Sequence, residues 1–188
     1  MKFMKQIAFA ILIATIGFSC QQNQTEETNQ AIDSTAISKI AKVDSSQLAK
    51  EWLVNSIENY FNQFGSDTNY IATICTKRYI ECKIEGINIE YSDEDPEVAY
   101  AKFKKKWQNV YDLSLMDTSN GFFIAGQDFG DTIKVSKCEL LKNLSQNSYL
   151  FETEIDDAQF KTKHFRDFRV ITQNHKFMID FVHEYEKQ

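Results

Sequence analysis

The chain has 188 residues, of which 43% are hydrophobic and 26% are charged, and its 21 basic residues against 27 acidic ones give a net charge of −6. Because nucleic acids and anionic lipids are themselves negatively charged, this balance argues against binding either of them through bulk charge. After residue 20 no stretch is apolar enough to span a bilayer, which takes about 20 consecutive apolar residues, so we expect no membrane span in the rest of the chain.

The N-terminus carries the pattern of an export signal. Lys2 and Lys5 precede an apolar run over residues 7–18, and this run is too short for a membrane-spanning helix. The sequence Gly17-Phe18-Ser19-Cys20 resembles the lipobox of bacterial lipoproteins. This resemblance implies that residues 1–19 are removed, that Cys20 is acylated, and that the exported protein is anchored to the bacterial outer membrane. The alternative is an ordinary secretory signal with an incidental cysteine.

Residues 20–46 are predicted to be the lipidated cysteine and a flexible tether. This segment is rich in Gln, Asn, Thr, Ser and Glu and has almost no aromatic residue. Such a composition buries too little apolar surface to offset the entropy of ordering. We expect a root-mean-square reach of about 25–30 Å, which would hold a single domain over residues 47–188 clear of the lipid headgroups.

Helical patterns fill the first half of the predicted domain. Asp44 followed by Gln47 has the spacing of a capping box, and an apolar stripe of helical period continues to residue 64. Residues 69–85 are ambiguous: a short helix is followed over 79–84 by an alternation that favours a strand. Asp95 before Pro96 predicts the start of another helix. Its expected buried stripe is Tyr100, Phe103, Trp107 and Tyr111.

Strand patterns fill the second half. We expect a short strand at 122–125, further strands at 132–141 and 149–155, and a hairpin formed by residues 166–172 and 177–183. Helices first and an antiparallel meander afterwards predict the α+β class, with N-terminal helices packed on a curved antiparallel sheet of four to five strands.

The C-terminal hairpin can be paired by counting outward from a two-residue turn at Asn174 and His175. One face then carries Thr172 with Phe177, Val170 with Ile179, Phe168 with Phe181, and Arg166 with His183. The other carries Ile171 with Met178, Arg169 with Asp180, and Asp167 with Val182.

Continuing this count brings together the one candidate site in the sequence. His164 would lie opposite Tyr185, so that His164, Arg166, His183 and Tyr185 form a cluster at one end of the apolar face. Arg166 could bind a carboxylate through two hydrogen bonds while His183 titrates near neutral pH, which would suit a ligand-binding site. The alternative is that these side chains are strand ends that reach solvent.

Motifs for other chemistry are absent from the sequence. It has no Cys-x-x-Cys, no glycine-rich phosphate loop and no Gly-x-Ser-x-Gly, and its three histidines lack metal-binding spacing, so we expect neither a metal nor a cofactor. Three cysteines remain after Cys20. Cys82 and Cys138 could pair if both lie on strands, or all three, including Cys75, could stay thiols.

The order of the predicted elements resembles the nuclear transport factor 2-like, or cystatin-like, superfamily over residues 47–185. The residues that carry this resemblance are the opening 49–53 with Tyr60-Phe61 and the closing 166–171 with 177–180. It implies a cone-like fold with a cavity between helices and sheet whose mouth lies near the four clustered residues. Homodimers paired through the sheet are common in that superfamily.

These features predict a lipid-anchored binding module of the cell envelope, more a binding protein than an enzyme, that takes a protein partner or a small molecule. The acidic surface would suit a basic protein, including the toxin blocked by an immunity protein. The alternative is an enzyme in which His164 or His183 performs acid–base chemistry on a small organic substrate.

Overall fold

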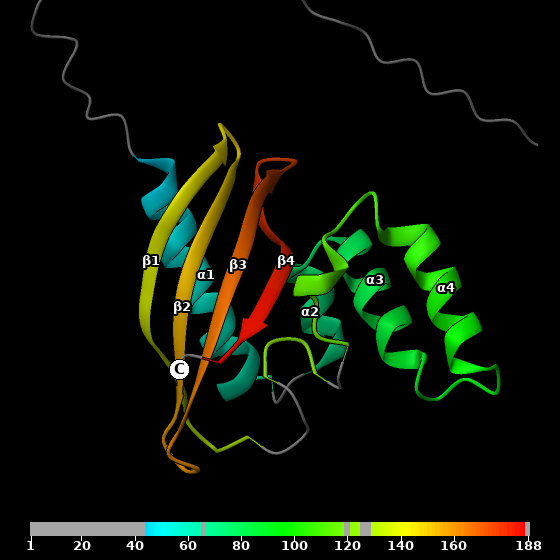
Figure 1. Ribbon diagram of the computed structural model, residues 1–188. Coiled ribbons are helices and arrows are strands. Elements are labelled where there is room, and N and C mark those ends of the chain that lie inside the picture. The colour runs from blue at the N-terminus through cyan, green and yellow to red at the C-terminus, as the bar shows by residue number, and fades with distance from the viewer. Residues whose placement is uncertain (1–43, 65–66, 119–120, 125–128, 187–188) are drawn as a thin grey trace, which may run out of the picture. The chain divides into compact units, whose positions relative to one another are not determined.

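The computed structural model describes residues 44–64, 67–118, 121–124 and 129–186 (Figure 1). The predicted signal peptide, Cys20 and nearly all of the predicted tether lie outside the described residues. Helices precede strands along the chain, as predicted. The elements are α1 (Ser45–Asn62), α2 (Thr68–Ile74), α3 (Lys77–Asn88), α4 (Pro96–Trp107), the short 3-10 helix η1 (Leu113–Leu115), β1 (Ile133–Ser145), β2 (Ser148–Asp157), β3 (Thr162–Gln173) and β4 (Lys176–Tyr185).

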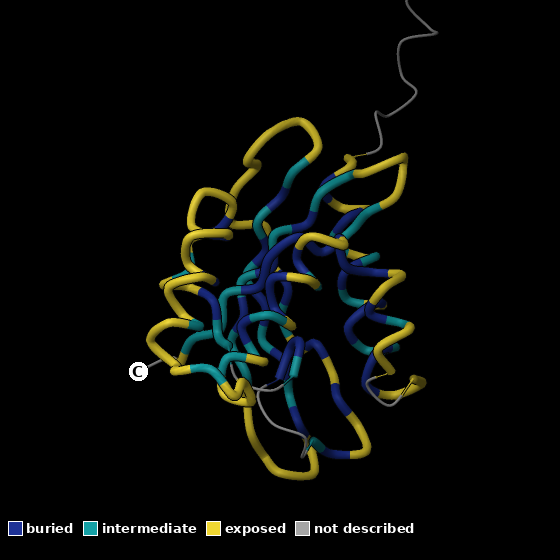
Figure 2. Tube along the Cα trace, turned by 90° about the vertical axis from the view of Figure 1, so that its right-hand side faces the viewer, coloured by how far each residue is buried: buried dark blue, intermediate teal, exposed yellow. Residues whose placement is uncertain are grey.

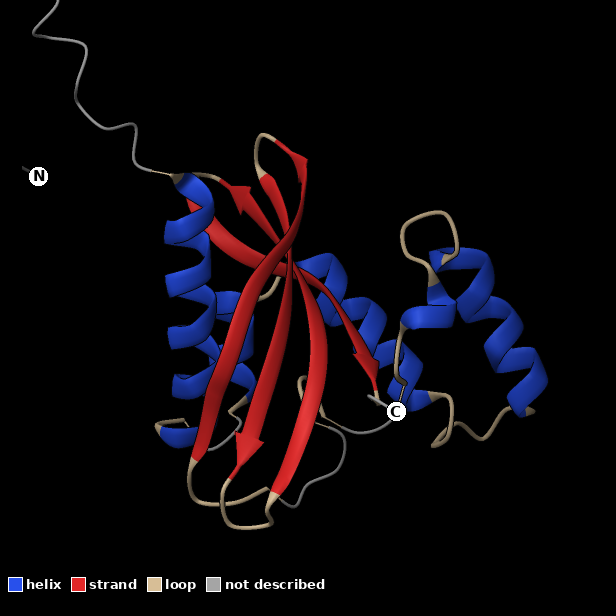
Figure 3. Ribbon diagram, turned by 60° about the vertical axis from the view of Figure 1, so that its left-hand side comes forward, coloured by secondary structure: helices blue, strands red, loops and turns tan. Residues whose placement is uncertain are grey.

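The strands form one open antiparallel sheet in the order β1-β2-β3-β4, which confirms the α+β class (Figure 3). The sheet has four strands in the described part of the chain. The expected short strand at 122–125 is wrong for residues 122–124, which are bends with buried side chains, and residue 125 lies outside the described residues. Three consecutive apolar side chains therefore fill the core from a loop.

Capping residues fix the starts of the helices. The Asp44 side chain accepts a hydrogen bond from the Ser46 N–H and caps α1, although the Gln47 side chain of the predicted capping box donates to Glu51 instead. Asp95 caps α4 by accepting from the Glu97 N–H, and Pro96 is the first helical residue, as predicted. The predicted strand over residues 79–84 is wrong, because these residues lie in α3, whose N-cap is Thr76. Within α3 the buried residues recur at helical spacing as Tyr79, Cys82, Lys83 and Gly86. In the predicted buried stripe of α4 and the loop after it, Tyr100 is exposed and the other three residues are buried.

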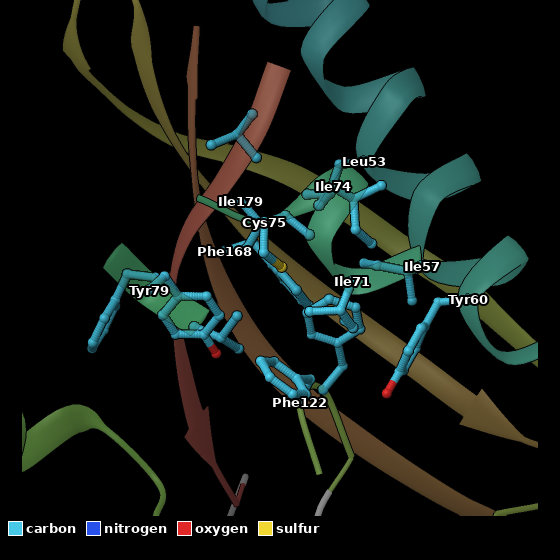
Figure 4. Packing of buried hydrophobic residues seen from close by; sticks show 14 of the residues in the cluster. Leu53, Ile57, Tyr60, Ile71, Ile74, Cys75, Tyr79, Phe122, Phe168 and Ile179 are labelled. Atoms are coloured by element: carbon cyan, nitrogen blue, oxygen red, sulfur yellow. The ribbon is translucent and has the colours of Figure 1, made fainter. Parts of the chain in front are cut away.

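The core lies between one face of the sheet, called here the inner face, and the helices α1 and α2. Figure 2 shows the buried parts of the chain gathered at the centre of the view. In Figure 4, Leu53, Ile57 and Ile71 from the helices lie beside Phe168 and Ile179 from the strands, and all five are almost fully buried. Each such side chain contributes about 1.5–3 kcal/mol through burial.

Side chains of α1 close the start of the outer edge of β1. The Asn62 amide accepts a hydrogen bond from the Ile133 N–H at 2.9 Å and donates one to the Ile133 carbonyl oxygen at 2.7 Å. The Glu58 carboxylate accepts from the Val135 N–H at 3.0 Å. The helix thus supplies the partners that a neighbouring strand would otherwise provide.

The hairpin of β3 and β4 confirms the predicted turn. Asn174 and His175 both have positive φ, 51° and 62°, as a two-residue hairpin turn requires. Three predicted pairs nearest the turn are present: Thr172 with Phe177, Ile171 with Met178, and Val170 with Ile179.

Beyond these pairs the predicted register is wrong. A β-bulge shifts the pairing by one residue, so that Arg169 lies opposite Phe181, Phe168 opposite Val182, Asp167 opposite His183, and Arg166 opposite Glu184. Asp180 is the extra residue on β4. Because successive side chains point to opposite faces, this single insertion moves every later side chain of β4 to the face opposite the predicted one.

Asp180 is held in the bulge by three side chains, two at the N-terminus of α3 and one on β3. Its side chain is 1% exposed and accepts hydrogen bonds from the Thr76 hydroxyl at 2.8 Å and from Nε of Arg78 at 2.7 Å. Nη2 of Arg169 on β3 lies 2.9 Å from the same carboxylate. Asp180 therefore ties the N-terminus of α3 to both strands of the hairpin.

We expect Asp180→Ala to lower the free energy of unfolding by about 3 kcal/mol or more, because it leaves the Arg169 cation and the buried Thr76 hydroxyl without their acceptor. Urea denaturation followed by circular dichroism measures this loss. The matched control is Glu154→Ala, which removes an ion pair with the half-exposed Lys163 and should cost about 1 kcal/mol or less. Equal losses in the two variants would contradict the role given to Asp180.

Candidate functional site

The bulge separates the four residues predicted to form a cluster. His164 and Arg166 lie on the inner face, since their β2 partners are Ile155 and Thr153, which are fully buried. His183 and Tyr185 lie on the outer face, with their ring centroids 5.1 Å apart. The structure therefore brings the four residues together as two pairs on opposite faces of the sheet and not as one group.

On the outer face, His183 and Tyr185 gather around a carboxylate. Nδ1 of His183 lies 3.6 Å from Asp167, and the Tyr185 hydroxyl donates to Asp167 at 3.2 Å and lies 3.4 Å from Glu152. Burial, followed by the charge of Asp167, raises the pKa of Tyr185. The tyrosine hydroxyl thus lies between two carboxylates on neighbouring strands, of which Glu152 also forms an ion pair with Lys137 at 2.8 Å.

On the inner face, Arg166 belongs to a buried cluster that the predicted register could not show. Nη2 of Arg166 lies 2.6 Å from Glu184, and Nζ of Lys83 on α3 lies 3.7 Å from the same carboxylate. Lys83 also donates to the Asp117 carbonyl oxygen at 2.5 Å, and Nε of Arg166 donates to the Phe123 carbonyl oxygen at 2.9 Å. The cluster joins α3, the backbone at Asp117 and Phe123, and the last two strands.

Burial shifts the pKa values of Glu184 and Lys83 in opposite directions. It raises the pKa of the Glu184 carboxyl and lowers the pKa of the Lys83 amine, because both charged forms lose their water. Groups shifted in this way can mark a catalytic site. Here, however, the side chains of Lys83, Arg166 and Glu184 are only 1–8% exposed, so a substrate has no access to them in this conformation. The cluster holds the fold together.

A hollow with a mostly apolar wall lies beside the turn of the C-terminal hairpin. We call it the hairpin groove. Its volume is about 650 Å³, and Ala72, Cys75, Ile80 and Met178 form its apolar wall. Lys77 and Lys176 stand at its rim with Glu81. A hollow of this size with an apolar wall and a few charged groups is typical of ligand-binding sites.

A second, more polar hollow of about 490 Å³ adjoins the hairpin groove, since the two share Lys77, Glu81 and Gln173. Arg78 and Thr172 also line it. Lys77 and Glu81 form an ion pair at 3.6 Å, whereas Arg78 and Arg169 share the one carboxylate of Asp180. The walls of the two hollows therefore carry a local excess of positive charge in an acidic chain.

Two other hollows lie around α4. One of about 510 Å³ is lined by Tyr100, Val110 and Leu113, and one of about 270 Å³ lies between α3 and α4. Neither is as large as the hairpin groove. None of the four hollows is lined by His164, Arg166, His183 or Tyr185.

The three cysteines of the described residues are free thiols, so Cys82 and Cys138 are not paired. Sγ of Cys82 lies 3.6 Å from the Met116 sulfur. Burial raises the pKa of Cys82 to about 12 and that of Cys138 to about 11. At neutral pH these thiols are protonated, which disfavours both nucleophilic attack and metal binding.

The described residues contain neither a cluster of metal-ligating side chains nor a membrane-spanning helix. No group of three or more His, Cys, Asp or Glu side chains in the described ranges is placed to hold a metal ion. Among the helices that the structure describes, none is both long enough and apolar enough to cross a membrane.

Arg166→Ala is expected to lower the free energy of unfolding by about 3–5 kcal/mol, because it leaves the buried Glu184 carboxylate without its nearest cation. Lys163→Ala is the matched control on the same strand, since Lys163 is half exposed and should lose about 1 kcal/mol or less. Chemical denaturation at neutral pH compares the two. A loss for Arg166→Ala no larger than that of the control would mean that the cluster does not hold the fold.

His164 should make stability depend on pH. Burial and the nearby Arg166 cation lower its pKa below 6.5, so the unfolded chain binds this proton more readily than the folded one. The stability contributed by His164 is complete above pH 6.5 and falls as pH drops toward the lowered value. We expect urea midpoints of the wild type, taken from about pH 8 to pH 5, to fall more steeply than those of His164→Gln. Parallel curves would contradict this.

Comparison of the chain with models of protein families, with curated proteins and with solved structures finds no match.

Proposed function

We propose that this chain is a lipid-anchored binding module of the bacterial cell envelope that uses the hairpin groove to hold a ligand. The lipobox-like sequence ending at Cys20 supports export and anchoring to the outer membrane. The helices followed by an antiparallel sheet are compatible with a nuclear transport factor 2-like domain, the superfamily that the sequence resembles.

One observation carries the proposed binding role: the hairpin groove, the largest of the four hollows named above, is apolar and opens at the surface between α2, α3 and the C-terminal hairpin. Ala72 at its wall is exposed, so the groove can be reached from solvent. An enzyme is less well supported, because the perturbed acid and base, Glu184 and Lys83, are enclosed in the core and do not line this groove.

Native mass spectrometry of the full-length protein, extracted in mild detergent from the membranes of a bacterial host, tests both parts of the proposal. We expect a mass that corresponds to loss of residues 1–19 and addition of acyl chains at Cys20, together with retained ligand. A chain that keeps its signal sequence or carries no acyl group would contradict the anchor.

A matched pair of variants locates the ligand. Ala72→Trp places a large ring in the hairpin groove, whereas Thr73→Trp places the same ring on the neighbouring exposed position outside its wall. The retained mass should be lost only from the first variant. Retention by both variants, or by neither, would contradict the hairpin groove as the binding site.

A further inference from the structure

β4 is the last strand of the sheet, and other described residues cover only part of its outer edge (Figure 1). α3 lies beside its second half, where Lys83 reaches Glu184. Just before that half, the Thr76 N–H donates to the Ile179 carbonyl oxygen at 2.8 Å, and Cys75 forms a single parallel bridge with Ile179. At residues 176–178, β4 forms no backbone hydrogen bond with any described segment outside the sheet. The edge from Lys176 to Met178 is therefore open.

The backbone groups at this open edge follow from strand geometry. In a strand, the N–H and C=O of one residue point to the same side, and the side alternates along the chain. Because the Ile179 carbonyl points outward to Thr76, Phe177 also directs its N–H and C=O outward. Lys176 and Met178 instead face β3, opposite Gln173 and Ile171. Phe177 thus offers a donor and an acceptor to a further strand.

We propose that the open edge of β4 and the hairpin groove together bind an extended, acidic segment of a partner protein, which joins the sheet as a short fifth strand. This inference rests on the proposed function and names its ligand class. The bridge between Cys75 and Ile179 shows that the edge already accepts a strand-like neighbour one residue beyond the open part. Backbone bonds to Phe177 supply general affinity, and alternate side chains of the segment enter the apolar wall formed by Ala72, Ile80 and Met178.

Charge complementarity selects the kind of segment. Lys77, Arg78 and Lys176 line the adjoining hollows. Glu81 offsets one of these charges, and the Asp180 carboxylate is shared by Arg78 and Arg169, so a net positive charge remains. A segment with an acidic residue beside its apolar residues would pair with this excess, whereas a basic segment would be repelled. The local charge is therefore opposite to that of the whole chain, and the partner expected here is acidic although the overall balance would suit a basic one.

The probe is a fluorescent nonapeptide in which Val and Thr alternate between two flanking Glu residues, titrated against the full-length protein in detergent and followed by anisotropy. We expect a dissociation constant of about 1–100 μM, typical of a short segment. The same peptide with alternate backbone amides N-methylated should bind at least about tenfold more weakly, because it keeps its side chains and loses its hydrogen-bond donors. Equal affinity of the two peptides would overturn strand addition.

Protein variants test the site with matched controls. Ala72→Trp should weaken binding of the peptide by about tenfold or more, and Lys176→Glu by about threefold or more. Thr73→Trp and Lys142→Glu, which change exposed residues outside the groove, should bind as the wild type does. Hydrogen exchange should show new protection of the Phe177 amide in the complex. Peptide binding without protection of that amide would also overturn the inference.

The remaining outcomes separate this inference from the proposed function. If the peptide does not bind but the native mass spectrum shows a small molecule that Ala72→Trp abolishes, the binding module stands and the peptide inference is wrong. If the protein self-associates in sedimentation experiments and Ala72→Trp abolishes this self-association, a second copy of the chain occupies the hairpin groove. The inference of an acidic partner protein is then wrong.

Discussion

The pairing register of β3 and β4 depends on one buried carboxylate. Asp180 is an inserted residue in β4, and its side chain points to the Thr76 hydroxyl, the Arg78 guanidinium and Arg169. A carboxylate that is 1% exposed is tolerated only with partners of this kind, because burial of an unpaired charge costs several kcal/mol. The same contacts fix the start of α3, since Thr76 is the N-cap of this helix and its hydroxyl donates a hydrogen bond to Asp180. The bulge, the position of α3 and the register of the hairpin therefore depend on the same set of contacts.

The bulge also sorts the charged residues of β4 between the two faces. Glu184 turns inward, where Arg166 and Lys83 neutralise it, and His183 turns outward to Asp167. Without the inserted residue, Glu184 would face solvent, and the buried cations of Arg166 and Lys83 would lack a carboxylate. The bulge thus converts a regular hairpin into one that can bury an ionic cluster in which both cations share the Glu184 carboxylate and donate further hydrogen bonds to backbone carbonyl oxygens. Such partners are the condition under which buried charges are compatible with a stable core.

The sequence predicts those parts of this structure that local chemistry determines. The caps Asp44 and Asp95 and the turn at Asn174 are local, and all three are confirmed. The bulge is not local, because two of the three partners that hold Asp180 there, Thr76 and Arg78, lie more than 100 residues earlier in the chain. Its one trace in the sequence is the adjacent apolar pair of Phe181 and Val182, which cannot both face the same side of a regular strand. The hairpin groove escapes prediction for the same reason, since its walls come from α2, α3 and a hairpin distant in sequence. The alternation over residues 79–84 misled because Ile80, Cys82 and Ile84 recur at the spacing of a strand, while Ile80 and Ile84 are also four residues apart, as on one face of a helix.

The two edges of the sheet are protected differently, and this difference bears on where a partner can bind. Asn62 and Glu58 close the start of the β1 edge, and the rest of β1 carries register shifts near Leu140 and Asn143 that disfavour a regular ladder with a neighbour. On β4, α3 and the bulge limit the open part to the residues beside the hairpin groove. An edge this short offers few backbone bonds, so by itself it would bind weakly and would not recruit strands indiscriminately. Affinity must then come from side chains that fill the groove and from charges that match Lys77 and Lys176. A short open edge beside an apolar groove can therefore select its partner where a long open edge would aggregate.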